Sequence, residues 1–338
     1  MCWSKIVTAG IIAAGIALFS GCGGKTDEME VSESLLPKPV SIINFTFDGS
    51  PSRLTFSKVP QRVVVTRPEI LDVLIRLGIG DKVVAASFPM NAKDRIPYYK
   101  EKIPHALIVE GELDKETALI QKPDFIIGWR LSFREGALGD VSFWKEKNIP
   151  VYIEENSGPV PAVDPFPPCT VDSEMNFIRN MGQIFDVREK TDRMIREIHD
   201  ELSRTQKLVK GRASQSVMVV EPEGKAFYNY DNGWVVGDMV EQLGGYMPAG
   251  EWRIGYEDLI SYNPDVLFVV YFNEEQRLQI IEMFRRAEFS SLKSVRNQRV
   301  YPIPFDHMYT PAIKTIDGLR IIRNGLYPDL AKKEGEKE

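Results

Sequence analysis

The chain has 338 residues, of which 43% are hydrophobic and 27% are charged. This composition is that of a globular protein long enough for two domains, and it excludes a fibrous repeat or a disordered acidic chain. The formal net charge is -6 at pH 7, so no general positive field exists and nucleic acid is not an expected partner. Three cysteines are too few to staple a fold of this length.

The first residues have the layout of a secretory signal peptide. Lys5 precedes an apolar run over residues 6–19, which is shorter than the roughly 20 residues that a membrane-spanning helix needs. Residues 18–22 (LFSGC) resemble a bacterial lipobox, in which the cysteine is acylated and becomes the first mature residue. We predict a lipoprotein signal peptide over residues 1–21 and a lipid anchor at Cys22. An uncleaved short anchor is the alternative, and both would place the body of the chain at the extracytoplasmic face of a membrane or in a periplasm.

The next segment predicts a tether followed by a first lobe. Residues 22–39 are rich in Gly, Ser, Pro and charge, which is typical of a flexible tether. Two short strands are expected over residues 41–47 and 53–56, and the β-branched run at 62–66 predicts a buried parallel strand. Thr66 is placed to cap a helix opening at Pro68, and Gly78 is placed to end it. Strands and helices alternate up to residue 154, which predicts an N-terminal lobe over residues 40–170 with a parallel sheet.

A long helix and a second lobe follow. Residues 188–210 predict a helix that reaches roughly 33 Å, and with a helix over 173–184 it forms a linker over residues 171–212. The alternation restarts in a C-terminal lobe over residues 213–330, and a charged tail covers 331–338. Residues 115–127 and 256–268 each place a Glu seven residues before a Pro-Asp pair that enters a buried strand, which suggests two similar lobes. The expected fold class is α/β, with two Rossmann-like lobes of parallel sheet joined by one long helix.

Aromatic residues and arginines gather where the predicted strands end, and ligands of open α/β sheets bind beyond the carboxyl ends of the strands. Rings supply contact area at low entropy cost and guanidinium groups hold anionic oxygens, so this surface suits a large, flat or aromatic, partly anionic ligand. Each of these residues has an alternative role: an aromatic residue can belong to the hydrophobic core, and an arginine can be an ordinary surface residue. The predicted ligand-binding residues are Arg67, Met90, Trp129 and Arg130 in the first lobe and Tyr228, Tyr230, Trp234, Trp252, Arg253, Tyr271, His307 and Tyr309 in the second.

The histidines argue against a bound bare metal ion. His105 and His199 lie far in sequence from His307, so the cage of several His that zinc or manganese prefers is not expected. His307 or Tyr309 would contact iron only if the ligand were haem, because both residue types ligate haem iron. We expect no resident cofactor and favour an intact chelate over a bare metal ion as the ligand.

Residues 42–328 resemble the extracytoplasmic substrate-binding proteins of bacterial ABC importers, in the class that binds ferric siderophores, haem and cobalamin. The segments that carry the resemblance are PQRVVV at 60–65, LGIGDKVV at 77–84, KPDFII at 122–127, IPVY at 149–152, VGDMVEQLGG at 236–245 and NPDV at 263–266. The resemblance implies a ligand held between two lobes, with modest hinge motion. It also implies that one exposed glutamate on each lobe, here Glu116 and Glu257, docks on arginines of the permease.

The function expected from the resemblance is capture of a chelate and its delivery to an importer. A ferric siderophore is the first choice, haem and a corrinoid are the alternatives, and the protein is expected to be a monomer. A secreted hydrolase is the rival class, but the chain has no Gly-x-Ser-x-Gly or His-Glu-x-x-His motif. A dinucleotide enzyme is disfavoured because Gly78-x-Gly80 follows a predicted helix rather than a strand. We therefore expect a protein that is not an enzyme.

Overall fold

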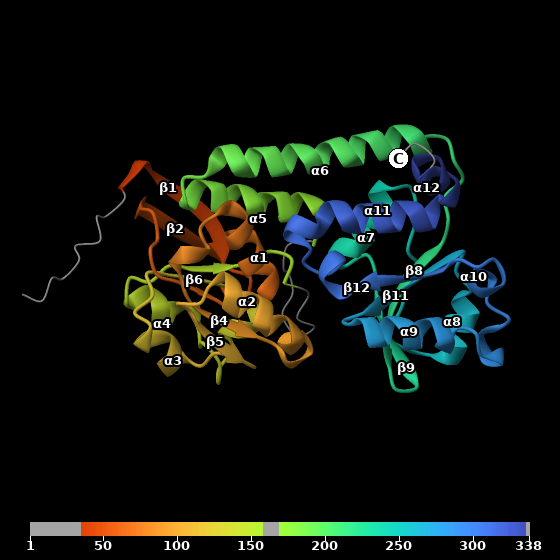
Figure 1. The fold of residues 1–338 in the computed structure, drawn as a ribbon, viewed down its shortest axis with the longest axis horizontal. Helices are drawn as coiled ribbons and strands as arrows, with labels where there is room; N and C mark the ends of the chain where they lie inside the picture. Colours follow the sequence, from red (N-terminus) through yellow and green to blue (C-terminus); the bar gives the residue numbers. More distant parts are fainter. Residues whose placement is uncertain (1–34, 158–168, 336–338) are drawn as a thin grey trace, which may run out of the picture. The chain divides into compact units, whose positions relative to one another are not determined.

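The computed structural model describes residues 35–157 and 169–335 (Figure 1). The predicted signal peptide and Cys22 lie outside the described residues. The first element is an antiparallel hairpin of β1 (Leu35–Phe45) and β2 (Pro51–Lys58). The predicted end of the tether at residue 39 is wrong, because β1 begins at Leu35 and the side chains of Leu36 and Val40 are buried in the core of the first lobe.

The first lobe, residues 35–157, is built on a five-stranded parallel sheet in the order β5-β4-β3-β6-β7. Val63 and Val65 pack into a core on one face of this sheet, whereas Val64 packs with Trp144 on the other face. This burial on both faces explains the unbroken β-branched run of the sequence. The elements are β3 (Val63–Val65), α1 (Pro68–Leu77), β4 (Val83–Phe88), α2 (Ile96–Lys102), β5 (Leu107–Glu110), α3 (Lys115–Ile120), β6 (Phe125–Gly128), α4 (Val141–Glu146) and β7 (Val151–Ile153).

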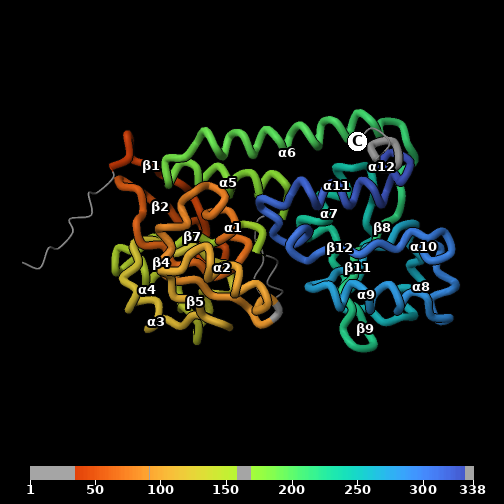
Figure 2. The backbone as a smooth tube through the Cα atoms, viewed as in Figure 1, coloured from red at the N-terminus to blue at the C-terminus, as the bar shows by residue number. Residues whose placement is uncertain are grey.

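Two helices, α5 (Val171–Ile184) and α6 (Arg188–Val209), follow the first lobe. Figure 2 shows α6 running along both lobes, with α5 beneath it on one side and α11 (Thr315–Leu326) beneath it on the other. The Nζ of Lys190 in α6 donates to the carbonyl of Leu77 at the end of α1. Near its other end, the buried Glu201 carboxylate of α6 lies 2.9 Å from Nη1 of Arg323 in α11. The long helix is therefore joined to both lobes, as the length of its sequence pattern predicted.

The second lobe, residues 217–335, has a mixed sheet in the order β10-β9-β8-β11-β12. Its central strands β8, β11 and β12 are parallel, as expected, while β9 runs antiparallel to β8 and β10 antiparallel to β9, so two antiparallel strands extend this sheet at one edge. The elements are β8 (Val217–Glu223), β9 (Ala226–Tyr230), α7 (Val235–Gln242), β10 (Arg253–Gly255), α8 (Tyr256–Tyr262), β11 (Val266–Tyr271), α9 (Glu274–Met283), α10 (Lys293–Arg296), β12 (Val300–Pro304), α11 and α12 (Pro328–Gly335).

Two boundaries in the second lobe differ from the sequence-based expectation. Tyr228 and Tyr230 lie within β9 rather than in a loop, because Gly224 adopts a φ of +61° and lets the chain turn back as a hairpin. The predicted charged tail over 331–338 begins inside α12, which extends to Gly335. Among the described residues, no helix is both long enough and apolar enough to cross a membrane.

The internal repeat of the sequence is confirmed in atomic detail. The Asp124 carboxylate accepts hydrogen bonds from the N–H groups of Gln61 and Arg62, just before β3. The Asp265 carboxylate accepts one from the N–H of Ser216, just before β8. Each aspartate therefore joins the start of its own strand, β6 or β11, to the start of the neighbouring strand in the same sheet.

Candidate ligand-binding site between the lobes

Aromatic rings from the two lobes meet directly. Trp129, at the end of β6, stacks on Tyr309, with ring centroids 4.8 Å apart and planes 24° apart. Tyr309 follows a 3₁₀ turn, η5 (Phe305–His307), that continues from β12. Its ring also contacts those of Phe305 at 4.7 Å and Trp234 at 4.9 Å. The fold thus brings Trp129 and Tyr309, which are far apart in the sequence, together where strands end in both lobes, as the rule for α/β sheets predicts.

The contacts between rings continue outward across the second lobe. Trp234 stacks on Trp252 at 5.2 Å, and Trp252 stacks on Tyr228 at 5.0 Å. Tyr230 meets Trp234 edge to face at 5.3 Å. Trp129 is 8% exposed and Trp252 is 43% exposed, so the rings run from a buried inner end to an open rim. We call this set the aromatic wall, and its members are Trp129, Tyr228, Tyr230, Trp234, Trp252 and Tyr309, all of them predicted site residues.

Hydrogen bonds fix the rim of the wall. Tyr230 donates its hydroxyl to Glu221 at 2.5 Å, and Tyr228 donates to Glu223 at 2.6 Å. Arg253, which we also predicted as a site residue, donates its Nε to the same Glu223 at 2.7 Å and remains well exposed. These contacts orient the two tyrosines and hold a guanidinium group at the outer edge.

The inner end of the wall carries an arginine. The guanidinium carbon of Arg67 lies 3.4 Å from the ring centroid of Trp129, and its Nε lies 3.6 Å from the Glu69 carboxylate. Burial lowers the pKa of Arg67, and the nearby Glu69 carboxylate acts against this shift. A cation stacked on an indole in a nearly water-free position attracts anionic groups strongly.

Thr66 positions Trp129 and does not cap α1. Its Oγ1 accepts hydrogen bonds from the N–H of Trp129 at 3.2 Å and from the hydroxyl of Ser132 at 2.9 Å. The residue at the N-cap of α1 is Arg67, which makes no side-chain capping bond. The predicted cap is therefore wrong, because the Thr66 side chain faces the loop after β6 rather than the start of the helix.

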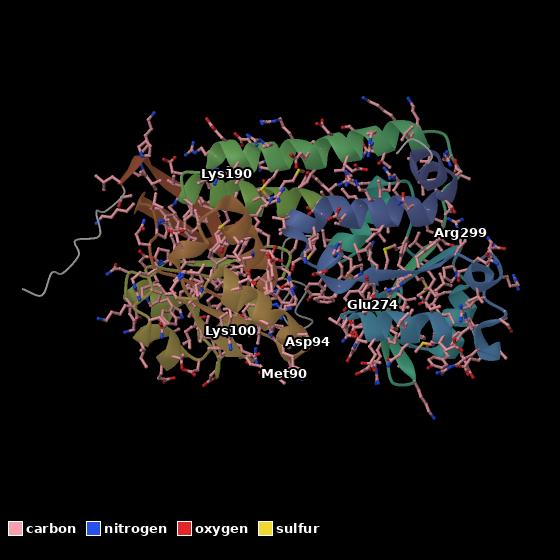
Figure 3. All side chains as sticks on the ribbon, in the orientation of Figure 1. Met90, Asp94, Lys100, Lys190, Glu274 and Arg299 are labelled. Atoms are coloured by element: carbon pink, nitrogen blue, oxygen red, sulfur yellow. The ribbon has the colours of Figure 1, made fainter. Side chains whose placement is uncertain are left out.

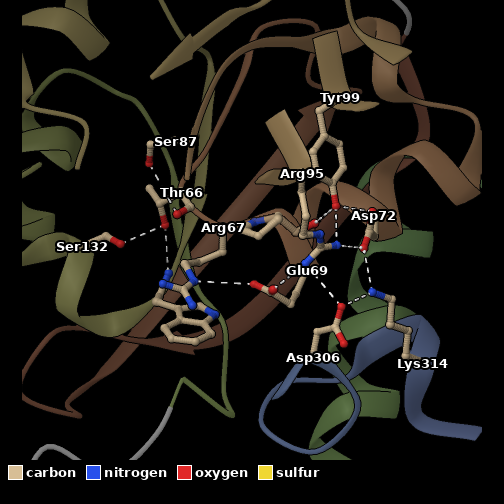
Figure 4. Close-up of polar contacts among 12 residues, drawn as sticks. Thr66, Arg67, Glu69, Asp72, Ser87, Arg95, Tyr99, Ser132, Asp306 and Lys314 are labelled. Atoms are coloured by element: carbon tan, nitrogen blue, oxygen red, sulfur yellow. Dashed lines mark hydrogen bonds and ion pairs between the residues drawn. The ribbon is translucent and has the colours of Figure 1, made fainter. Parts of the chain in front are cut away.

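An ion-pair network also crosses between the lobes (Figure 4). Arg95, in the 3₁₀ turn η2 (Met90–Arg95), contacts Glu69 at 3.1 Å and Asp72 at 2.7 Å in its own lobe, and Asp306 of the second lobe at 3.4 Å. Lys314 of the second lobe contacts Asp306 and lies 3.6 Å from Asp72. Sequence reasoning missed this network, because its ion pairs join residues that are far apart in the chain and no local pattern marks them.

Two small cavities flank Arg67. One, of about 70 Å³, is lined by both lobes, with Arg67 and Arg95 on one side and Tyr271, Phe272 and Asp306 on the other. The second, of about 160 Å³, lies within the first lobe and is lined by Arg67 and Trp129. Pockets that hold drug-sized ligands typically enclose about 300–1,000 Å³. Both cavities are smaller than this, so the lobes leave little empty space around Arg67.

The other predicted residues of the first lobe, Met90 and Arg130, are not among the residues that line these cavities. Arg130 is fully buried, and its Nε donates to the carbonyl of Phe47 at 2.6 Å, which ties the loop after β6 to the β1–β2 turn. Met90 is 61% exposed and lies with Asp94 at the end of the first lobe that faces the second (Figure 3). Met90 therefore lies at the outer edge of the candidate site. Arg130 does not face the site, and its buried side chain holds the loop that carries Trp129.

His307 and Tyr309 were the predicted contacts to haem iron. The Nδ1 of His307 lies 2.7 Å from the Asp306 carboxylate. Burial raises the pKa of Tyr309, which keeps its phenol protonated at neutral pH. Among the described residues, no three His, Cys, Asp or Glu side chains are arranged to hold a metal ion, and the Cys169 side chain is buried.

Glu116 and Glu257, the predicted docking residues, are both exposed. Glu116 lies in the first turn of α3 and Glu257 in the first turn of α8. Each helix precedes the strand that carries the repeated aspartate, so the two glutamates occupy corresponding places in the two lobes.

Comparison with known proteins agrees with this architecture. A relative from Bacillus subtilis (strain 168), an uncharacterized ABC transporter substrate-binding lipoprotein named YvrC, is 20% identical over 345 residues, 98% of each chain. The crystal structure of a periplasmic binding protein from Veillonella parvula DSM 2008 matches with a TM-score of 0.77 and 28% identity, over 89% of this chain and 95% of that one. An ABC-type Fe3+-hydroxamate transport system structure from Saccharomonospora viridis DSM 43017 shares the fold, with a TM-score of 0.65 and 19% identity over 85% of this chain and 98% of that one.

The match to a protein family covers most of the chain. The model of the family described as "Periplasmic binding protein" matches residues 63–307, which span both sheets and the two linking helices. This family is one of binding proteins, which confirms the prediction that the chain is not an enzyme. The chain belongs to the periplasmic binding protein family.

Proposed function

We propose that this protein is an exported substrate-binding lipoprotein that captures an iron chelate between its lobes and delivers it to the permease of an ABC importer. A ferric siderophore is the first candidate, and haem or a corrinoid is the alternative. Family membership supports the binding role, and the name of the Bacillus subtilis relative supports both the ABC importer and the extracytoplasmic location.

The observation that carries this proposal is the aromatic wall that crosses from one lobe to the other. Trp129 of the first lobe and Tyr309 of the second present ring faces to each other, and Arg67 adds a cation beside them. Parting the lobes would turn these contacts into two facing surfaces able to enclose a large organic ligand. Such a surface suits a chelate with conjugated or apolar parts and anionic oxygens better than a bare metal ion.

The proposal includes a lipid anchor at Cys22, a monomeric protein and no resident cofactor. The small residues before Cys22 and the description of the relative as a lipoprotein support the anchor.

Docking to the permease is assigned to Glu116 and Glu257. Their helices α3 and α8 lie on the side of the lobes opposite α6 (Figure 1). One exposed acid on each lobe, on the side away from the linking helix, would let a permease contact both lobes at once.

The test is to purify the protein without denaturation from its own host and to record its absorbance and native mass spectrum. We expect a bound species whose mass and chromophore identify an iron chelate, haem or corrinoid. The ligand-free protein should then be stabilised thermally by that compound, without turnover. The proposal is wrong if no such species is found and neither ferric chelates, haemin nor cobalamin raises the Tm.

A further inference from the structure

Two neighbouring hydrogen-bond donors at the inner end of the aromatic wall are buried. The Nε of Arg67 and the Nε1 of Trp129 have no acceptor within residues 35–157 and 169–335. The Glu69 oxygen nearest to Arg67 Nε is 3.6 Å away, which is longer than a hydrogen bond. Buried donors in folded proteins nearly always have a partner, so this pair calls for acceptor oxygens that come from another molecule.

The second lobe places an acid and a ring against the same part of the first lobe. The Asp306 carboxylate contacts the Arg95 guanidinium at 3.4 Å, and three residues later the Tyr309 ring stacks on Trp129 at 4.8 Å. Arg67 and Arg95 both line the small cavity between the lobes. In this arrangement, Asp306 therefore supplies an anion to Arg95, and Tyr309 supplies a ring to Trp129.

We infer that the ligand is a chelate bearing aromatic rings with anionic oxygens, and that it binds by inserting a ring between Trp129 and Tyr309. Its oxygens accept from Arg67 Nε and Trp129 Nε1 and compete with Asp306 for Arg95. This inference rests on the proposed function and narrows its substrate class. Ferric catecholates and haem share this chemistry, whereas aliphatic hydroxamates and citrate complexes lack the ring.

The first experiment compares four probes on the ligand-free full-length protein by tryptophan fluorescence and thermal shift. Ferric tris(2,3-dihydroxybenzoate) and haemin are aromatic anions, ferric citrate is an anion without rings, and ferrioxamine B is a hydroxamate without rings. We expect at least one aromatic probe to bind tenfold or more tightly than both comparators. The separate catecholate and haemin titrations identify which aromatic anion the protein takes.

The second experiment places the ligand in the structure. Trp129→Leu and Arg67→Gln should each weaken binding of the preferred aromatic probe by tenfold or more. Arg285→Gln, at an exposed arginine of the second lobe that lies outside the aromatic wall, should change the affinity less than twofold. Asp306→Asn should tighten binding several-fold, because the competing carboxylate is lost and more of the protein is open. Since Trp129→Leu can perturb folding, circular dichroism is recorded for each variant and the partly exposed Asp306→Asn gives an independent result.

The outcomes separate this inference from the proposed function. If ferric citrate or ferrioxamine B binds as tightly as the aromatic probes, the inference is overturned and the proposed function stands. If an aromatic probe binds but folded Arg67→Gln and Asp306→Asn leave its affinity unchanged, the assigned position between Trp129 and Tyr309 is wrong. If none of the four probes binds, cobalamin also fails to bind and no chelate accompanies the protein purified from its host, the proposed function itself is overturned.

Discussion

The main-chain N–H of Ala312, in the second lobe, donates a 2.6 Å hydrogen bond to the buried carboxylate of Glu174 in α5. Ala312 has a φ of +44°, in the left-handed region that side chains other than glycine rarely adopt. The other oxygen of Glu174 accepts from the Asn156 amide at 2.6 Å. Glu174 of α5 is therefore hydrogen-bonded to both lobes. It contacts the strained turn at Ala312 in the second lobe and Asn156, just after β7, in the first.

Stability should depend on pH through the buried acids at this junction. Burial raises the pKa of Glu174 to about 7, and burial together with the nearby Glu174 raises the pKa of Glu154. Below pH 4.5 these groups are protonated in both the folded and unfolded chains, so they have no effect. Between pH 4.5 and about 7 the unfolded chain releases protons that the folded protein keeps, so the free energy of unfolding falls as pH rises.

For one carboxyl whose pKa rises from 4.5 to about 7, the loss is about 3 kcal/mol. Urea unfolding at intervals from pH 4.5 to 8 measures it. Glu154→Gln should flatten the curve, because one of the two interacting carboxyls is gone. A free energy of unfolding that is constant or rises with pH across this window in the unmodified protein would contradict the prediction.

Glu201→Ala should destabilise the protein by about 3 kcal/mol. Glu201 and Arg323 are both nearly fully buried, and their contact at 2.9 Å joins α6 to α11. Removing the acid leaves a buried guanidinium without its carboxylate. Chemical denaturation checks the value, with Asp329→Ala as the control, since Asp329 pairs with Arg212 on the surface and should cost less than about 1 kcal/mol. Equal losses from the two variants would show that burial of the first pair does not matter.

Gly318→Ala should disturb the turn that carries Asp306 and Tyr309. A Cβ at position 318 in α11 would lie 2.0 Å from the carbonyl oxygen of His307, a contact that only a backbone shift can relieve. We expect a loss of about 1–3 kcal/mol, together with a change in tryptophan emission as Tyr309 moves against Trp129. In Gly255→Ala the new Cβ meets its nearest atom at 3.4 Å, so this control should leave both the Tm and the emission unchanged. An unchanged emission spectrum in Gly318→Ala would argue that the turn does not position Tyr309.

Glu116→Gln combined with Glu257→Gln should abolish importer-dependent uptake while leaving ligand affinity within twofold. Both acids are exposed and lie outside the aromatic wall, so the lobes and the site should be unaffected. Uptake by cells carrying the importer and binding by the purified protein are measured side by side. Glu146→Gln with Glu282→Gln is the matched pair of exposed acids, one on each lobe, that should transport normally. Normal uptake by the first double variant would place the docking surface elsewhere.

Local sequence patterns predicted much of the architecture because the physics behind them is local. The run Val63–Val65 must be buried on both faces of a sheet, and Gly78 ends its helix with a φ of +78°. The repeat around Asp124 and Asp265 could be recognised in the sequence because both lobes use the same side chain for the same contact. In each lobe, the aspartate joins the starts of two neighbouring strands. The rule that ligands bind at strand ends selected aromatic residues that the fold brings into contact with one another, and their role in binding stays a prediction.

Pairings between distant residues could not be predicted in this way. Two examples are the ring that faces Trp129 and the acid of the second lobe that contacts Arg95. Both depend on how the two sheets pack against α5 and α6, and the periodicity of the sequence does not encode this packing. The burial of Arg130 and the role of Thr66 were likewise decided by the turns packed around them. The amino-acid sequence by itself determined two α/β lobes, a long connecting helix and the residue types of the site, because helix and strand periodicity act over a few residues. Only the tertiary structure decided that Tyr309 and Asp306 of the second lobe contact Trp129 and Arg95 of the first, since contacts between lobes depend on packing over the whole chain.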